Sequence, residues 1–287
     1  MAKGRELKGR IKSVENTRKI TRTLEMVATS KMKRTQDRVA AARPYAESLR
    51  QVIADLYSPD LAERFPLLRQ PATIKRAAVI MLTANRGLAG AFNANLIKET
   101  RATVARLERE GATVDIHAVG KKGIGYYRYL GRALAASHTD IGDRPSADQA
   151  AAIVGGLMDQ FTRGELDAVY VIYPSFKSIL SAPPASVQIL PVQPPEAGGR
   201  QRDYILSPDA ETILGELLPL YVRNAVYRAL VEMTAAFYAA QRTAMKNATD
   251  NASDMLKILG RTYNRARQAT ITQEIAEIVG GAAALQG

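Results

Sequence analysis

Two glycine-bearing stretches contain the residue types that bind phosphate, and they are the strongest candidates for chemistry in this chain. NRGLAGAFN (85–93) sets two glycines and an arginine between an apolar run and a helical pattern, and GKKGIG (120–125) includes two lysines. Backbone amides at the start of a helix can bind an anion. Neither stretch has the spacing of a dinucleotide fingerprint or of a Walker loop. We favour a structural turn for each, with a nucleotide-binding enzyme as the alternative.

Other side chains suited to catalysis are few. The chain has two histidines, His117 and His138, and no cysteine. His117 lies in a strand-like apolar run, which favours a structural role over metal binding. Neither a nucleophile elbow nor a zinc-protease motif occurs. The sequence therefore predicts a non-catalytic protein with no cofactor and no metal. We also expect a reducing compartment, no membrane span and no export signal.

The positive charge is concentrated at the N-terminal end. Residues 1–50 carry fourteen Lys or Arg against five Asp or Glu, a net +9 out of +12 for the whole chain. A basic arm attracts nucleic acid, anionic lipid or an acidic protein surface. No aromatic residue precedes Tyr45, so bases would have nothing to stack on. A nucleic-acid-binding protein remains an alternative beside an acidic protein partner.

Long helices are predicted at both ends of the chain, over about 1–58 and 207–287. In the first, apolar residues recur every three or four positions, at Leu7, Ile11, Val14, Ile20, Leu24 and Val27. Thr17 and Thr21 stand where a strict heptad seam would have leucine, and Pro44 predicts a kink or a frayed turn. In the second, residues spaced by eleven predict a contact stripe: Val222, Met233, Ala244, Met255 and Ala266.

Strands and helices alternate between about 75 and 200. Strands are predicted over 77–83, 114–120, 167–173 and 185–192. Helices are predicted after NRGLAGAFN, after the second strand, and from a Ser146 cap to about Thr162. A further helix start is predicted at Ser207-Pro208-Asp209, with proline in the first helical position. This order predicts a parallel, Rossmann-like α/β domain.

The terminal helices are too long to fold around that domain. At 1.5 Å per residue they would extend about 75 and 90 Å, whereas a domain of about 130 residues has a radius of gyration near 14 Å. We therefore expect an antiparallel two-helix coiled coil formed by the N- and C-terminal helices, which projects from the α/β domain.

Five stretches from across the chain resemble the gamma-subunit family of F-type ATP synthases. They are NTRKITRTLEMVATSKMKR (16–34), RPYAE (43–47), NRGLAGAFN (85–93), MKNATDNASD (245–254) and YNRARQATITQEIAEIVGGAAA (263–284). Because they include both ends and the middle, the resemblance covers nearly the whole chain.

The resemblance implies a rotor without catalytic activity of its own. In that family the coiled coil enters a hexamer of three alpha and three beta subunits, and the foot rests on the membrane ring of c subunits. Rotation of the ring drives the beta subunits through their binding states. The expected partners are the alpha3-beta3 hexamer, the epsilon subunit and the c ring. The expected location is the cytoplasmic face of a bacterial inner membrane, held there through the c ring.

The resemblance also assigns contact residues. Arg267, Gln268 and Thr272 match positions that hydrogen-bond to beta-subunit loops, and Leu24 stands where the family often has methionine. The basic residues Lys31, Lys33 and Arg34 are candidates to face an acidic region of beta.

At the foot, Tyr204 matches a family aromatic residue, whereas Ser207 replaces an acidic one and Asp209 is a possible substitute. The chain lacks the cysteine pair of chloroplast members, and its start at Met1 favours a bacterial protein.

Overall fold

The computed structural model describes residues 2–56, 64–193 and 209–286. These divide into two compact units, one containing 1–29 with 241–287 and the other containing 30–240. Tyr204, Ser207 and Pro208 lie outside the described residues. No helix in the described ranges is long and apolar enough to cross a membrane.

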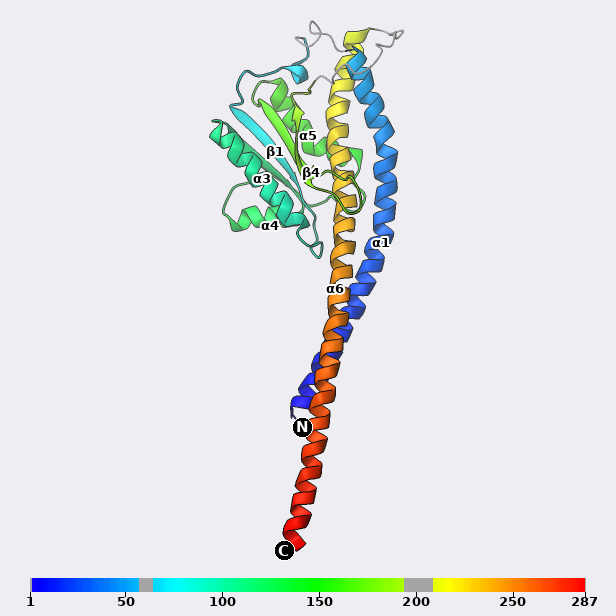
Figure 1. The fold of residues 1–287 in the computed structure, drawn as a ribbon. Helices are drawn as coiled ribbons and strands as arrows, with labels where there is room; N and C mark the ends of the chain where they lie inside the picture. The colour runs from blue at the N-terminus through cyan, green and yellow to red at the C-terminus, as the bar shows by residue number, and fades with distance from the viewer. Residues whose placement is uncertain (1, 57–63, 194–208, 287) are drawn as a thin grey trace. The chain divides into compact units, whose positions relative to one another are not determined.

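Two long helices, α1 and α6, begin and end the described chain (Figure 1). The element bounds are α1 Ala2–Leu56, η1 Pro66–Leu68, β1 Arg76–Leu82, α3 Phe92–Arg109, β2 Thr113–Val119, α4 Lys121–Tyr129, β3 Ala136–His138, α5 Ala147–Thr162, β4 Ala168–Pro174, β5 Pro184–Leu190 and α6 Ala210–Gln286. Every predicted helix and strand in the described ranges is present. The three-residue strand β3 was not predicted.

The five strands form one sheet in the order β3-β2-β1-β4-β5. Strands β3, β2, β1 and β4 are parallel, whereas β5 runs antiparallel to β4. The prediction of a parallel sheet is therefore wrong at β5, because only about ten residues join it to β4 and a parallel return needs a longer crossover. Since β1 has β2 on one side and β4 on the other, the strand order reverses beside β1.

The core of the α/β domain consists of buried strand residues covered by helices. All of β1 after Arg76 is buried, as are most residues of β4. Right-handed crossovers place α3 and α4 on one face of the sheet and α5 on the other. Helix α5 begins with a capping box in which the Ser146 hydroxyl accepts from the Gln149 amide, as the sequence predicted.

Helix α1 buries one stripe at strict seven-residue spacing. Its most buried positions include Thr21, Ala28, Met32, Thr35 and Val39. The stripe predicted through Ile20 and Val27 is wrong there, because these side chains are 60% and 47% exposed. Threonine and alanine occupy the buried seam at these positions. The prediction followed the larger apolar residues next to them in the sequence, which are exposed. The helix also continues through Pro44, whose missing amide hydrogen bond falls on an exposed turn.

Helix α6 does not keep the predicted eleven-residue stripe. Val222 and Met233 are buried, but Met255 is 51% exposed. From Met245 onward the more buried positions instead recur in steps of three and four, through Thr249, Ala252 and Leu256. This is the spacing of a two-helix seam.

Candidate functional site

In the unit formed by residues 1–29 and 241–287, α1 and α6 pack through small and hydroxyl side chains. Thr21 and Thr249 are 8% and 6% exposed, and their hydroxyl oxygens lie 2.8 Å apart. The Thr249 hydroxyl also lies 2.8 Å from the Met245 carbonyl oxygen, and Thr21 donates to the Arg18 carbonyl. A buried polar pair of this kind favours one register between two helices.

Arg267, Gln268 and Thr272 lie on exposed turns of α6 in the same unit. The Thr272 hydroxyl donates to the Gln268 backbone carbonyl at 3.0 Å, and the Arg267 and Gln268 residues are exposed. All three residues are therefore accessible on the surface of α6. What they contact outside this chain stays a prediction.

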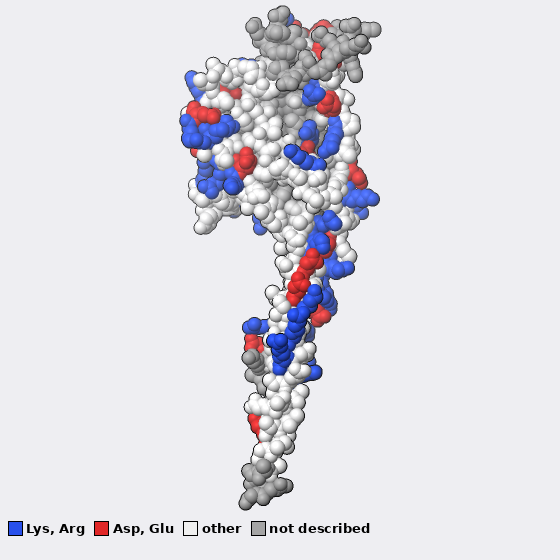
Figure 2. Space-filling view, in the orientation of Figure 1, with Lys and Arg blue, Asp and Glu red and all other residues white. Residues whose placement is uncertain are grey.

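The end of α6 beyond these residues has large apolar side chains at the surface, a feature that the sequence reasoning missed. Ile271, Ile275, Ile278 and Val279 are between 46% and 71% exposed. Their spacing of about four residues places them along one side of the helix. Figure 2 shows this end nearly free of Lys and Arg. Isoleucine repeating at helical spacing within a segment so poor in basic residues was the signal available in the sequence.

The other predicted contact residues, one leucine and three basic residues of α1, have different surroundings. Leu24 is half-buried in the seam of α1, and Lys33 and Arg34 are exposed. Lys31 is engaged inside the other unit, where its ammonium lies 2.6 Å from a carboxylate oxygen of Asp143 and 3.3 Å from the Tyr238 hydroxyl.

Asp143 is the centre of a polar cluster that we call the Asp143 cluster: Lys31, Arg86, Asp143 and Tyr238. The Arg86 guanidinium forms an ion pair with Asp143 and donates to the Tyr238 hydroxyl at 2.8 Å. Burial alone would raise the pKa of Asp143, but hydrogen bonds from Lys31 and Tyr238 and the charge of Arg86 outweigh it and leave this pKa below its usual value. The hydrogen bond to Asp143 raises the pKa of Lys31. Both groups therefore stay charged at neutral pH.

The GKKGIG stretch includes the start of α4, and two of its glycines lie very close to the end of β1. Gly120 has φ of +92°, and a Cβ there would lie 2.0 Å from the Thr83 carbonyl oxygen. A Cβ at Gly123 would lie 2.3 Å from the Met81 methyl carbon. The backbone contact and positive φ require glycine at Gly120, and a side chain at Gly123 would displace the Met81 methyl, which supports the structural interpretation of the stretch.

The polar side chains of NRGLAGAFN are bound to the chain itself. The Asn85 amide donates to the carbonyls of Thr139 and Ile141, and its oxygen accepts from the Lys121 amide at 3.0 Å. Asn93 accepts from the Ala84 amide at 2.9 Å. These bonds join the loop after β1 to the segments after β2 and β3. They favour a structural turn over a phosphate site.

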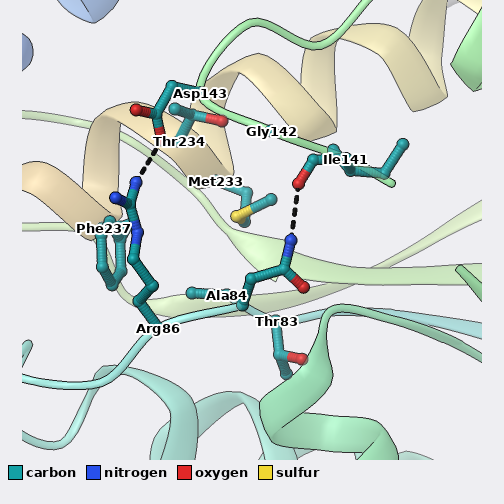
Figure 3. Close-up of a pocket in the computed structure, with 10 residues that line it drawn as sticks. Thr83, Ala84, Arg86, Ile141, Gly142, Asp143, Met233, Thr234 and Phe237 are labelled. Carbon is teal, nitrogen blue, oxygen red and sulfur yellow. Dashed lines mark hydrogen bonds and ion pairs between the residues drawn. The ribbon is translucent and has the colours of Figure 1, made fainter. Parts of the chain in front are cut away.

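A pocket of about 330 Å³ lies beside this loop, where the strand order reverses (Figure 3). Arg86 extends along one side of the pocket to Asp143, and Met233, Thr234 and Phe237 of α6 form another wall. Open α/β sheets bind ligands at this position. In this chain, residues of α6 line part of that ligand-binding position. Across the described ranges, no group of His, Asp and Glu side chains is suited to hold a metal ion.

Of the predicted foot residues, only Asp209 is described. Its carboxylate accepts from the Thr212 amide at 2.8 Å and from the Thr212 hydroxyl at 3.1 Å, which caps the start of α6 at Ala210. The hydrogen bond from the Thr212 amide lowers the pKa of Asp209.

Comparison with known proteins matches the whole chain. The family model described as ATP synthase matches residues 3–285. An ATP synthase gamma chain of Gemmatimonas aurantiaca is 66% identical, and one of Leptospira biflexa is 40% identical; the alignments cover 100% and 99% of this chain and the full length of each relative. Nothing among these matches supports a nucleic-acid-binding protein.

Solved structures agree with these sequence matches. The central stalk and c-ring structure of the Tetrahymena thermophila mitochondrial ATP synthase contains a chain with a TM-score of 0.62 and 26% identity, over 80% of this chain and 99% of that one. A chain of the Euglena gracilis mitochondrial ATP synthase has a TM-score of 0.67 at 19% identity, over 99% of this chain and 95% of that one, which supports the fold. On these sequence and family matches, the chain belongs to the ATP synthase gamma chain family.

Proposed function

We propose that this chain is the central rotor shaft of an F-type ATP synthase. It couples rotation of the membrane c ring to successive conformational changes of the catalytic beta subunits during ATP synthesis, and it has no catalytic activity of its own. The observation that carries this proposal is the uncovered end of α6, where exposed isoleucines follow a polar segment.

An exposed apolar strip at the end of a helix needs a covering partner. Ile271, Ile275, Ile278 and Val279 are all more than two-fifths exposed. Contiguous exposed apolar surface marks an interaction site. Between Gln268 and Gly281 the only charged residues are Glu274 and Glu277. A surface with few charges and no long basic side chains suits a shaft end that turns inside an apolar sleeve of alpha and beta subunits.

The polar residues before this strip are assigned to contacts with beta. Arg267, Gln268 and Thr272 hydrogen-bond to its loops, and Leu24 of α1 is a further contact residue. Exposed Lys33 and Arg34 face acidic surface. Lys31 is a weaker candidate for the same role, because Asp143 already neutralises part of its charge.

The opposite end is assigned to the membrane ring and to the small stalk subunit. Tyr204, Ser207 and Asp209 meet the c ring, and the epsilon subunit binds beside them. The division into 1–58, 75–200 and 207–287 then separates a coiled coil of two terminal helices from an α/β domain. The complex lies at the cytoplasmic face of a bacterial inner membrane, with the chain attached through the c ring.

Reconstitution with alpha and beta subunits tests the proposal. The purified chain should hydrolyse no ATP, and with alpha and beta it should form a complex in which a bead attached to the chain rotates during hydrolysis. A chain that fails to co-assemble, or a complex whose bead stays still, would refute the proposal.

A double variant tests the contact residues. Arg267→Ala with Gln268→Ala should weaken ATP-driven proton pumping in the complete enzyme while leaving the helical content unchanged. Lys257→Ala is the control, because Lys257 is exposed and its ion pair is with Asp254 on its own helix. Full pumping by the double variant would remove these two residues from the coupling surface.

A further inference from the structure

Within the unit of residues 30–240, both long helices hold the same loop of the α/β domain through the Asp143 cluster. Asp143 lies in the loop between β3 and α5. Lys31 reaches it from α1, Tyr238 from α6, and Arg86 from the loop after β1. Helix α1 makes a second bond to this loop, because Arg38 donates to the Asp143 backbone carbonyl at 3.2 Å.

The Tyr238 side chain gives this cluster a rigid support. Tyr238 is 2% exposed, and the Lys31 ammonium lies 5.4 Å from the centre of its ring. Its ring packs edge-on against Phe237, which packs in the same way against Phe92 of α3. The hydroxyl that accepts from Lys31 and Arg86 is therefore held in place by the aromatic core.

A second polar contact joins the same two helices to another loop. Glu232 of α6 is 4% exposed, and its carboxylate accepts from the Phe176 amide at 3.0 Å and from Arg228 at 2.9 Å. Arg43 of α1 reaches the Phe176 carbonyl at 3.5 Å. Phe176 follows β4, so each contact lies just beyond the carboxyl end of a parallel strand.

Hydrogen bonds at two separate points can fix the orientation of the α/β domain on the helices, which apolar packing alone cannot do. Apolar contact, such as that of Met233 and Phe237 along α6, is non-directional and tolerates sliding. Charge-assisted hydrogen bonds fix both distance and angle. Two such points on each helix resist both rotation and translation of the domain along the helices.

We propose that the Asp143 cluster and the Glu232–Phe176 contact form a two-point polar clamp that keeps the α/β domain and the helices α1 and α6 in one orientation under load. The clamp assigns a role to Arg86, which lies in the NRGLAGAFN stretch. It rests on the proposed rotor function, because a rotor needs its parts to turn together.

The clamp is tested by the distance between two labels on the full-length chain. The chain has no cysteine, so Ala40→Cys on α1 and Ala105→Cys on α3 give two specific spin-label sites, both exposed. We compare the parent with Asp143→Asn, and with Asp143→Asn combined with Glu232→Gln. Arg86→Gln is the milder variant, since this half-exposed side chain is not needed to fill the core.

Glu108→Gln is the matched control. Glu108 pairs with Arg132 at 2.6 Å with similar exposure, but both residues of this pair belong to the α/β domain. In Asp143→Asn, loss of a partly exposed ion pair should raise about fivefold the fraction of molecules whose distance between the two labels differs from that of the parent. The fraction should rise further in the double variant. The control should match the parent.

A double variant with the parent's distance distribution would overturn the clamp. In the complete enzyme, the clamp variants should pump fewer protons per ATP hydrolysed than the Glu108→Gln enzyme. An unchanged ratio despite displaced labels would overturn the coupling role. Failure of the clamp can be told apart from failure of the rotor proposal. The label distances are measured on the chain alone, whereas the rotor proposal fails only if the parent itself does not assemble or rotate.

Discussion

Replacing Gly120 by alanine should destabilise the α/β domain strongly, and the structure gives the size of the effect. The new Cβ would lie 2.0 Å from the Thr83 carbonyl oxygen and 2.6 Å from its carbon, both backbone atoms. Alanine also disfavours the φ of +92° found at this position. Backbone strain of this kind costs about 1–3 kcal/mol and overpacking adds about 1–3 kcal/mol. We expect a loss of about 2–5 kcal/mol in the free energy of unfolding.

The loss should be spread over three strands, because Gly120 cannot move alone. Its amide donates to the His138 carbonyl at 2.8 Å, and the Thr83 amide donates to the Val119 carbonyl at 2.8 Å. Moving Gly120 away from Thr83 would strain both bonds. Hydrogen exchange should therefore speed up at the ends of β1, β2 and β3.

Gly125→Ala is the matched control from the same stretch. Gly125 lies inside α4, and no atom lies within 4 Å of the Cβ that alanine would add. Alanine is favoured over glycine in a helix by about 1 kcal/mol, so this variant should be slightly more stable than the parent. Urea unfolding followed by tyrosine fluorescence measures both variants, since the chain has twelve tyrosines and no tryptophan.

The opposite outcome would support the phosphate-binding alternative for GKKGIG. In that case Gly120→Ala would unfold like the parent, within about 0.5 kcal/mol, and would instead lose binding of inorganic phosphate. A stable Gly120→Ala variant would contradict the close approach of Gly120 to the Thr83 backbone at the end of β1. If the parent binds no phosphate and Gly120→Ala is unstable, the stretch is a packing element.

Three further predictions concern polar side chains that are buried or half-buried. Thr249→Val should lower the local stability of the helix pair by about 1 kcal/mol, because the bond to the Thr21 hydroxyl is lost while Thr21 keeps its bond to the Arg18 carbonyl; hydrogen exchange near Thr21 measures the loss. Asn85→Ala should cost about 1 kcal/mol in urea unfolding, because it removes three hydrogen bonds that join this loop to the segments after β2 and β3, and a cost near zero would contradict the role of this loop. Burial lowers the pKa of His117 below its unfolded value of about 6.5, so the chain should lose stability as the pH falls through that value, and His117→Gln should flatten this loss.

Much of the α/β domain could be predicted from the sequence because its strands are continuous apolar runs. The run from Ala77 has no polar residue before Thr83, and the structure makes it the central strand β1. Strand β3 was missed because its three residues, Ala136–His138, are partly exposed and carry no apolar pattern. The antiparallel direction of β5 follows from its short connection to β4, a constraint that the alternation of strands and helices does not include.

The contact residues of the Asp143 cluster were out of reach for a different reason. Lys31 and Asp143 are separated by 112 positions, and each looks like an ordinary surface charge in its own segment. Only the fold brings them within hydrogen-bonding distance. The predicted stripe of α1 is wrong at Ile20 and Val27 for another reason: the neighbouring Thr21 and Ala28 are small enough to bring the helices together and take the buried positions.

Helix α6 shows why one period cannot describe a helix whose surroundings change along its length. From Val231 to Ala239 every residue is buried, so this stretch has no polar face. From Met245 to Thr270 the more buried positions form a single seam, as expected for one helix partner. From Ile271 to Ala282 every residue is exposed, yet apolar residues continue at helical spacing. Since burial inside this chain cannot account for those residues, their spacing records a surface that lies outside the chain, and a covering partner is the simplest physical explanation for them.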